Sequence, residues 1–329
     1  MSTPPPASLS PPADVLARCA ALLDARRALA RAENTDAFRV IHSAADGFAG
    51  LTVDSLGPAL LVEQHRADAD PSALIAALVA LVGADVPIFL KMRFGRDPAQ
   101  YGGRQVSGPP HGGVLDVCED GLRFRVHLLG ETHIGLFLDG RKARALVAAK
   151  TAGKRVLNLF SYTGGFGVAA ATGGARSTVN IDNKASALRL AERNYAANGL
   201  AFDARTFFRC DALDYLRRAA RQQARFDWII LDPPPRFYSH RRLWEMHRDY
   251  GKLLARCLAV VAPEATLMAG LNALRASDDA FVDMVAEAFG AHPDIAWEVR
   301  QFAGPGDDFP FSADRPVARF ALIAVRPRA

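Results

Sequence analysis

The chain has 329 residues, of which 50% are hydrophobic, and a formal net charge of +5 at pH 7. This length and apolar content can fill two cores, so we expect two domains rather than a disordered or fibrous protein. The mild basic excess permits an anionic partner without requiring one. The four cysteines lack the spacing of a zinc site or a disulfide framework. We therefore expect a cytoplasmic protein with no metal and no membrane segment.

The N-terminal third predicts a tail, a helix and a small domain. Residues 1–12 are rich in Pro and Ser and lack the apolar centre of a signal peptide, so we expect a disordered tail. Residues 13–33 predict a helix with an apolar face. Residues 34–110 predict a small α/β domain with strands at 38–42, 51–54, 59–63 and 88–91 and a helix at 71–81. Residues 102–113 are typical of a Gly/Pro-rich linker.

Residues 111–329 are expected to form a larger α/β domain. A hairpin is predicted at its start, from strands at 122–128 and 134–139. Further strands are predicted at 156–159, 177–182, 207–210, 226–231, 265–272, 295–300 and 319–325, with helices at 184–197, 212–222 and 241–261. Alternating strands and helices favour a parallel sheet, and the last two strands, which no predicted helix separates, should pair antiparallel. The expected fold class is therefore a Rossmann-like, seven-stranded α/β domain beside a smaller one.

The stretch from Val156 to Gly167 carries the first functional signal. It consists of an apolar strand, a turn containing Gly164, Gly165 and Gly167, and an Ala-rich helix start. Glycines let a ligand approach the backbone closely, and the start of a helix offers unpaired N–H groups and the positive end of the helix dipole. The spacing is not that of a dinucleotide fingerprint, so the glycines alone are weak support for a ligand site.

Three acidic residues end the strands that follow this turn. Asp182, Asp211 and Asp232 each close a predicted strand. The carboxyl ends of parallel strands are where open α/β sheets bind their ligands, so these side chains should gather at one edge of the sheet. The first acid, about 20 residues after the glycine turn, is where such folds place a carboxylate on ribose hydroxyls.

Two prolines distinguish the last of these three strand ends. Pro233 and Pro234 follow Asp232 directly, and each proline fixes its own φ and restrains the residue before it. A dehydrogenase has no evident use for such a rigid extended loop. A methyltransferase can use it to wall the accepting atom beside the methyl donor.

Together these motifs carry a family resemblance. The segment Phe160-Ser161-Tyr162-Thr163-Gly164-Gly165-Phe166, the acids Asp182 and Asp211, and Leu231-Asp232-Pro233-Pro234 resemble the S-adenosylmethionine-dependent large-subunit ribosomal RNA methyltransferases, whose best-known members make 5-methylcytosine in 23S rRNA. The resemblance covers the chain from about Thr35 to its end. It implies a class I methyltransferase that takes S-adenosyl-L-methionine as its cofactor.

The resemblance also implies roles for individual residues. Asp182 would hold the ribose hydroxyls and Asp211 the adenine amino group. The catalytic residues would be Asp232, Pro233 and Pro234. The remaining residues of the expected cofactor site are Phe137, Asp139, Arg141, Phe160, Ser161, Tyr162, Thr163, Gly164, Gly165, Asn183 and Ala212, with Asp232 contributing to both sites. Gly140 departs from the Gln that the family usually carries between Asp139 and Arg141.

Two further departures concern the substrate. Too few residues precede Asp36 for the N-terminal RNA-binding β-barrel that the family usually carries. Carbon 5 of cytosine is a poor nucleophile, and enzymes that methylate it add a cysteine thiolate to carbon 6. The family carries this cysteine either at the end of the fifth strand or directly after Asp-Pro-Pro. Here the first segment ends in Asn272 and has no cysteine, and the second position is Pro235. We therefore expect methylation without a cysteine nucleophile, as in the related branch that methylates a guanine nitrogen.

Aromatic and cationic residues after the proline loop suit a base of single-stranded RNA, because rings stack on bases while cations neutralise phosphates. The expected substrate residues are Arg236, Phe237, Tyr238, Arg241 and Asn272. Phe237 and Tyr238 would equally serve to cover the following helix. A turn-rich loop from Gly304 to Phe311 could close over the acceptor, although the pair Asp307-Asp308 would repel phosphate.

The sequence thus favours a methyltransferase acting on RNA, ribosomal RNA above all. A methyltransferase of a small molecule or protein stays open, and so does a non-catalytic cofactor-binding ribosome-assembly factor. Either a monomer or a homodimer fits the sequence.

Overall fold

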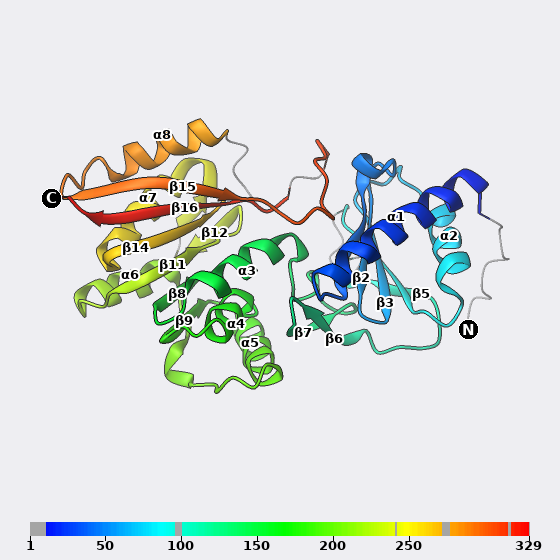
Figure 1. Ribbon diagram of the computed structural model, residues 1–329, viewed down its shortest axis with the longest axis horizontal. Helices are drawn as coiled ribbons and strands as arrows, with labels where there is room; N and C mark the ends of the chain where they lie inside the picture. Colours follow the sequence, from blue (N-terminus) through cyan, green and yellow to red (C-terminus); the bar gives the residue numbers. More distant parts are fainter. Residues whose placement is uncertain (1–10, 96–100, 241, 272–276, 315–316, 329) are drawn as a thin grey trace. The chain divides into compact units, whose positions relative to one another are not determined.

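The computed structural model describes residues 11–95, 101–240, 242–271, 277–314 and 317–328 (Figure 1). The chain divides into two compact units. Unit 1 comprises Met1–Leu138 and Gly306–Pro316, and unit 2 comprises Asp139–Pro305 and Val317–Ala329. Unit 1 therefore extends beyond the range 34–110 expected for the small domain, and it includes a segment near the C-terminus. The predicted tail falls largely on residues 1–10, outside the described part.

Unit 1 is built on a five-stranded sheet in the order β1-β2-β3-β4-β5. Its strands are β1 (Ala37–His42), β2 (Leu51–Leu56), β3 (Ala59–Gln64), β4 (Ile88–Met92) and β5 (Arg104–Ser107). Two helices, α1 (Ala13–Ala32) and α2 (Ser72–Val82), share an apolar core with this sheet. The predicted helices and the first four strands are confirmed. The predicted linker is wrong in part, because β5 lies within it and pairs antiparallel with β4.

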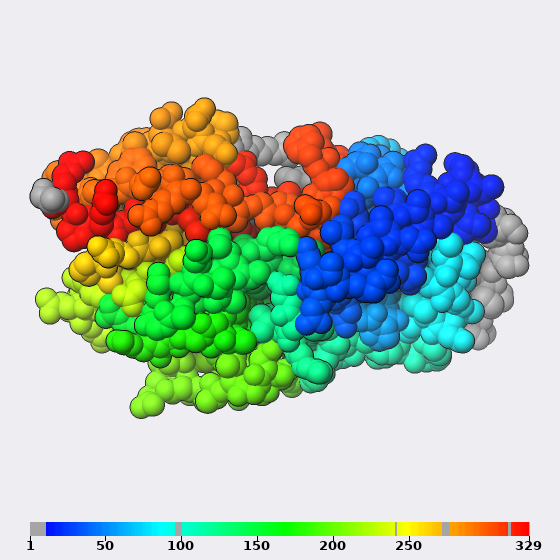
Figure 2. All heavy atoms as spheres, viewed as in Figure 1, coloured from blue at the N-terminus to red at the C-terminus, as the bar shows by residue number. Residues whose placement is uncertain are grey.

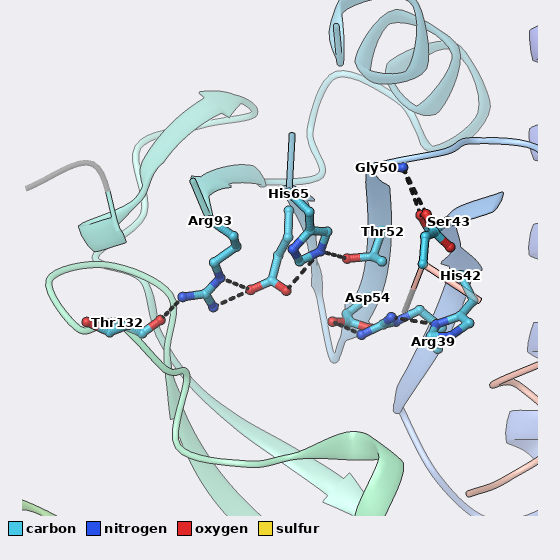
Figure 3. Close-up of polar contacts among 11 residues, drawn as sticks. Arg39, His42, Ser43, Gly50, Thr52, Asp54, His65, Arg93 and Thr132 are labelled. Atoms are coloured by element: carbon cyan, nitrogen blue, oxygen red, sulfur yellow. Dashed lines mark hydrogen bonds and ion pairs between the residues drawn. The ribbon is translucent and has the colours of Figure 1, made fainter. Parts of the chain in front are cut away.

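Alternation along these strands separates an apolar face from a charged one. Val40, Val53 and Val62 belong to the core shared with α1 and α2. The intervening residues Arg39, Asp54 and Glu63 are buried as well. Successive side chains of a strand point to opposite faces, so these charged groups line the other side of the sheet. They pair with one another and with neighbouring polar groups (Figure 3).

Unit 1 also contains a hairpin, made of β6 (Val114–Glu119) and β7 (Leu122–His127). Its two-residue turn, Asp120-Gly121, has positive φ at both positions, 51° and 77°. Asp-Gly is favoured in such turns because their backbone twist matches that of the strands. The predicted partner strand at 134–139 is therefore wrong. Residues 134–137 are irregular, and Leu138–Gly140 form a 3₁₀ turn.

Unit 2 contains the seven-stranded sheet, in the order β10-β9-β8-β11-β14-β16-β15. Its strands are β8 (Arg155–Leu159), β9 (Ser177–Asp182), β10 (Phe207–Arg209), β11 (Phe226–Leu231), β14 (Val261–Gly270), β15 (Ile295–Ala303) and β16 (Phe320–Pro327). The first five strands in the sheet order pair in parallel, and β16 is antiparallel to both of its neighbours. The predicted sheet is confirmed, including its antiparallel end.

Strand register aligns the ends of the central strands. Leu159 of β8 pairs with Ile181 of β9 and with Leu231 of β11. The residues that follow these three are Phe160, Asp182 and Asp232. Parallel pairing in this register therefore brings the glycine turn and two of the strand-end acids to one edge of the sheet.

Helices cover both faces of this sheet. The apolar side chains of α6 (Ala212–Arg221), α7 (Met246–Cys257) and α8 (Asp278–Phe289) share a core with the sheet on one face. On the other face, α4 (Gly165–Thr172) contacts β8, β9 and the helices α3 (Arg141–Lys150) and α5 (Ala185–Ala197). In Figure 1, α8 runs along β15 and β16. The sequence analysis did not predict α8.

The predicted helix from 241 to 261 is wrong in its first part. Residues on both sides of position 241 form a hairpin, β12 (Arg236–Ser239) paired with β13 (Arg242–Glu245), and α7 begins only at Met246. The reason is tertiary, because Phe237 of β12 stacks on Trp244 of β13 with ring centroids 5.8 Å apart, and Trp244 is buried. Packing of these two rings favours strands over the helix that periodicity suggests.

Candidate functional site

The turn after β8 has an unusual backbone. Phe160 and Tyr162 have φ values of 58° and 48°, a left-handed conformation that costs energy for residues with a side chain. Hydrogen bonds from the neighbouring strand hold it. Ser161 N donates to Ile181 O, and Tyr162 N donates to Asp182 Oδ2, each at 2.8 Å. Such strain persists where the surroundings enforce it, and it occurs often at ligand sites.

Two glycines of the turn are explained by packing. Gly164 has φ of 76°, and a Cβ there would lie 2.9 Å from Ala191 Cβ of α5. A Cβ on Gly167 would lie 2.6 Å from Tyr195 Oη and would also clash with Asn180 Oδ1. Glycine is thus required at both positions for α4 to approach β9 and α5, whether or not a ligand lies nearby.

Ser161 offers the clearest opening for a ligand. Its side chain is 6% exposed, and within the described part of the chain its Oγ has no hydrogen-bond partner. A buried hydroxyl without a partner is costly unless something else binds it. The helix α4 begins four residues further on, so unpaired backbone N–H groups accompany this hydroxyl. The arrangement fits the polar end of a bound cofactor.

The acids that follow β9 and β10 already take part in hydrogen bonds. Asp182 Oδ1 accepts from Lys184 N at 2.8 Å, in addition to the bond from Tyr162. Asp211 caps α6, accepting from the backbone N–H groups of Leu213 and Asp214. A carboxylate oxygen has two lone pairs, so Asp182 can still accept from two hydroxyls. Asn183 is exposed beside Asp182, and Ala212 is buried.

Asp232 follows β11 and is half-buried. The pKa of its carboxyl is raised to about 7, mainly by burial and also by the negative charge of Asp139, while Arg144 acts in the opposite direction. A Cβ at Gly270, on β14, would clash with Asp232 Oδ1. Glycine at 270 thus lets the carboxyl lie against the neighbouring strand. Pro233 is buried and Pro234 is exposed.

The expected methionine-side residues lie on both sides of the division between units. Phe137, in unit 1, is 50% exposed, and its ring lies 5.3 Å from that of His133. In unit 2, Asp139 Oδ2 accepts from Ala318 N at 2.9 Å, and Arg141 is only 2% exposed at the start of α3. The Arg141 side chain is therefore enclosed by protein.

Arg144 is a residue that the sequence analysis did not single out. It is 4% exposed, and its guanidinium lies 5.8 Å from the ring centre of Phe166, in the turn region. A Cβ on Gly140 would come within 2.7 Å of Arg144 Nη1. The departure from Gln at position 140 was the available signal, because only a residue without a side chain leaves this space to the guanidinium.

The residues expected to bind the substrate have different surroundings in the structure. Phe237 packs between Trp244 and Phe160, whose ring centroid lies 4.9 Å away, so it supports the turn after β8. Arg236 forms an ion pair with Glu245 at 3.0 Å. Tyr238 is 66% exposed on the hairpin. Arg241 and Asn272 lie outside the described residues.

The two cysteines of unit 2 are poor nucleophiles. Burial raises the pKa of Cys257 to about 12 and also raises the pKa of Cys210 above its usual range. Because the thiolate is the reactive form, both are protonated at neutral pH. Within the described ranges, no cluster of three or more His, Cys, Asp or Glu could hold a metal ion. No helix in those ranges is long and apolar enough to span a membrane.

A mixed sheet in this order, with five parallel strands, a strained turn and carboxylates at its strand ends, is typical of a Rossmann-like enzyme that binds a nucleoside cofactor. The profile of the S-adenosylmethionine-dependent methyltransferase family matches residues 74–305. The chain therefore belongs to the S-adenosylmethionine-dependent methyltransferase family. The resemblance noted in the sequence is confirmed, and so are the predicted enzyme class and cofactor.

Individual relatives agree. The Bacillus subtilis protein YwbD, named as a candidate ribosomal RNA large subunit methyltransferase, is 31% identical over 86% of this chain and 72% of its own length. A ribosomal RNA large subunit methyltransferase of Deinococcus radiodurans is 32% identical over 83% of this chain and 68% of its own length. The crystal structure of SMU.776, described as a methyltransferase in complex with SAH, has a TM-score of 0.83 and 25% identity, covering 94% of this chain and 80% of that chain.

Proposed function

We propose that this protein methylates a nitrogen atom of a base in ribosomal RNA, without a cysteine nucleophile. The names of the curated relatives support ribosomal RNA as the substrate, and the net charge of +5 is compatible with an anionic partner. The proposal of a nitrogen acceptor rests on Asp232, whose carboxyl is half-buried and has a raised pKa. The two cysteines of the same unit are held protonated and therefore do not supply a nucleophile.

In this proposal the strained turn and the strand-end acids hold the cofactor. Ser161 Oγ and the N–H groups at the start of α4 bind its methionine end. Asp182 accepts hydrogen bonds from the ribose hydroxyls, and Asp211 with the Ala212 N–H holds the adenine. When bound, S-adenosylmethionine supplies an electrophilic methyl group on a positively charged sulfur. The residues Phe137, Asp139 and Arg141 remain proposed contacts on the methionine side.

Asp232 has two roles in this mechanism. Its carboxylate accepts a hydrogen bond from the N–H of the base, which orients the nitrogen lone pair toward the methyl group. The methyl–sulfur bond would break as the new nitrogen–carbon bond forms, with S-adenosylhomocysteine as the leaving group, and the Asp232 carboxylate would take up the proton that the nitrogen loses. A pKa of about 7 suits this transfer, because a base works best when its pKa is close to the working pH. Pro233 and Pro234 fix the backbone that walls this position.

Methyl transfer to unmodified RNA tests the proposal. Ribosomal RNA transcribed in vitro is incubated with the protein and S-adenosylmethionine carrying a labelled methyl group, and the digested nucleosides are identified by mass spectrometry. We expect a nitrogen-methylated nucleoside. Formation of 5-methylcytosine would contradict the cysteine-free route. If, in a cell extract, the label enters proteins or metabolites but no RNA, the substrate is a protein or a small molecule and not RNA.

A further inference from the structure

A short segment near the C-terminus belongs to unit 1 although the strands on either side of it belong to unit 2. The chain leaves unit 2 after Pro305 and returns to it at Val317. We call the described residues of this segment, 306–314, the strap. In Figure 2 the strap appears in orange-red beside the blue residues of unit 1. Its sequence is Gly-Asp-Asp-Phe-Pro-Phe-Ser-Ala-Asp.

The strap is anchored before its midpoint. Asp308 is 1% exposed, and its Oδ2 accepts from Arg39 N of β1 at 2.9 Å. Phe309 is 6% exposed; its ring lies 4.8 Å from the Arg39 guanidinium and 5.5 Å from the ring of His42. Arg39 is itself fixed by Asp54 and His42, as Figure 3 shows. Of the two acids expected to repel phosphate, Asp308 is thus buried and hydrogen-bonded within unit 1, whereas Asp307 is exposed.

The strap is anchored again after its midpoint. Asp314 Oδ2 accepts from Ser43 Oγ at 2.6 Å, and Ser312 Oγ donates to the other oxygen of the same carboxylate. Ser43 in turn accepts from Gly50 N at 2.8 Å (Figure 3). Hydrogen bonds from Ser312 and Ser43 lower the pKa of Asp314 to about 2, although burial opposes them. Asp314 thus stays charged, and bound in place, at any physiological pH.

Between these anchors Phe311 is 91% exposed. Single exposed apolar residues are common on protein surfaces and usually need no explanation. Phe311 differs because the chain is anchored by buried contacts on both sides of it, at Asp308 and Phe309 before it and at Asp314 after it. The aromatic ring thus lies in solvent, and the folded state lacks the stabilising free energy that burial of the ring would contribute.

The surroundings suit a nucleic-acid base. Arg18 donates to Gly47 O, and the Arg66 side chain passes 3.1 Å from the Cβ position of Gly50, so both lie beside the turn that holds Asp314. Both arginines are exposed. An exposed ring can stack on an unpaired base, and exposed arginines of the same unit can attract its phosphates, although Arg66 also forms an exposed ion pair with Asp68.

We propose that Phe311, presented by the strap of unit 1, is a stacking platform for an unpaired base of the RNA substrate. The inference rests on the proposed function, because it takes RNA as the substrate. It adds a contact from unit 1 that none of the expected substrate residues provides.

Phe311→Leu and Phe311→Trp form the matched pair of variants. Leucine keeps an apolar side chain but has no π face, whereas tryptophan keeps the face. Because Phe311 is exposed, neither change should alter folding. We expect Phe311→Leu to raise the dissociation constant for in vitro transcribed 23S rRNA about five- to a hundredfold, the range for losing one stacked base. Phe311→Trp should bind as tightly as the wild type. With saturating RNA, kcat should be unchanged in both variants.

Phe311→Trp supplies a second measurement. Added RNA should quench the extra fluorescence of this variant, measured as its difference from the wild-type signal. Equal RNA binding by wild type and Phe311→Leu would overturn the inference and leave the proposed function intact. Loss of binding in Phe311→Ala but not in Phe311→Leu would also overturn it, because an apolar contact would then suffice. A wild type that neither binds nor methylates RNA would overturn both proposals.

Discussion

The two sheets use similar charged side chains in different ways. In unit 1, Arg39 and Asp54 lie within neighbouring strands and bind each other, with Arg39 Nε 2.5 Å from Asp54 Oδ1. In unit 2, Asp182 and Asp232 lie where parallel strands end. Burial raises the pKa of Asp54 to about 6 despite Arg39, and that of Asp232 to about 7. A raised pKa alone therefore does not separate Asp232, the acid proposed to act in catalysis, from the structural acid Asp54; their positions in the two sheets differ.

The largest expected effect is on catalysis in unit 2. Asp232→Ala should lower kcat about 10²- to 10⁴-fold, the usual contribution of a general base, while binding of S-adenosylhomocysteine changes little. The control is Asp232→Asn, which keeps a hydrogen-bond acceptor but cannot take up the proton. Its activity should lie between those of Asp232→Ala and the wild type. Full activity in Asp232→Ala would remove this residue from the mechanism.

Unit 1 should instead respond in stability. Arg39→Ala leaves Asp54 buried without its partner and also loses the contact with Phe309, so we expect a loss of about 3–5 kcal/mol in the free energy of unfolding. Arg66→Ala is the matched control, because its ion pair with Asp68 is exposed and screened by water, so its loss should change the free energy of unfolding little. Urea unfolding followed by circular dichroism measures both. Equal effects of the two changes would contradict the structural role given to Arg39.

The raised pKa of Asp232 predicts opposite pH responses for the proposed catalysis and for stability. Methyl transfer needs the carboxylate, so the rate should fall about tenfold per pH unit below about pH 7. For stability, the folded state binds the Asp232 proton more tightly than the unfolded state does between about pH 4 and 7. This residue's contribution to stability is therefore greatest at low pH and falls as pH rises. An initial rate that is level from pH 5 to 8, with both substrates saturating, would argue against proton uptake by Asp232.

A smaller effect is expected on cofactor binding. Asp182→Ala should weaken the binding of S-adenosylhomocysteine by about 1.5–3 kcal/mol, the range for hydrogen bonds to a charged group. Asp203→Ala is the control, because Asp203 makes a similar bond to a backbone N–H on an exposed turn of the same unit. Calorimetric titration compares the two. Unchanged affinity in Asp182→Ala would refute the ribose assignment.

The sequence alone determined most of unit 2. The apolar strand and glycine turn at residues 156–167, the strand-end acids Asp182, Asp211 and Asp232, and the antiparallel last strands all follow from local periodicity and turn chemistry. These signals lie within a few residues of the feature they predict, so a single sequence shows them. They also carried the resemblance that the family comparison confirmed.

Only the tertiary structure decided which partner each segment finds. Ring packing makes strands where the sequence suggested the start of a helix, whereas the Asp120-Gly121 turn that pairs β7 with β6 was a local signal that the sequence analysis missed. The strap binds Arg39, Ser43 and Gly50, more than 260 residues away in the sequence. Such contacts depend on which surfaces meet after folding, and no local pattern records them. For the same reason, the burial of Asp308 and the exposure of Phe311 could not be read from the sequence.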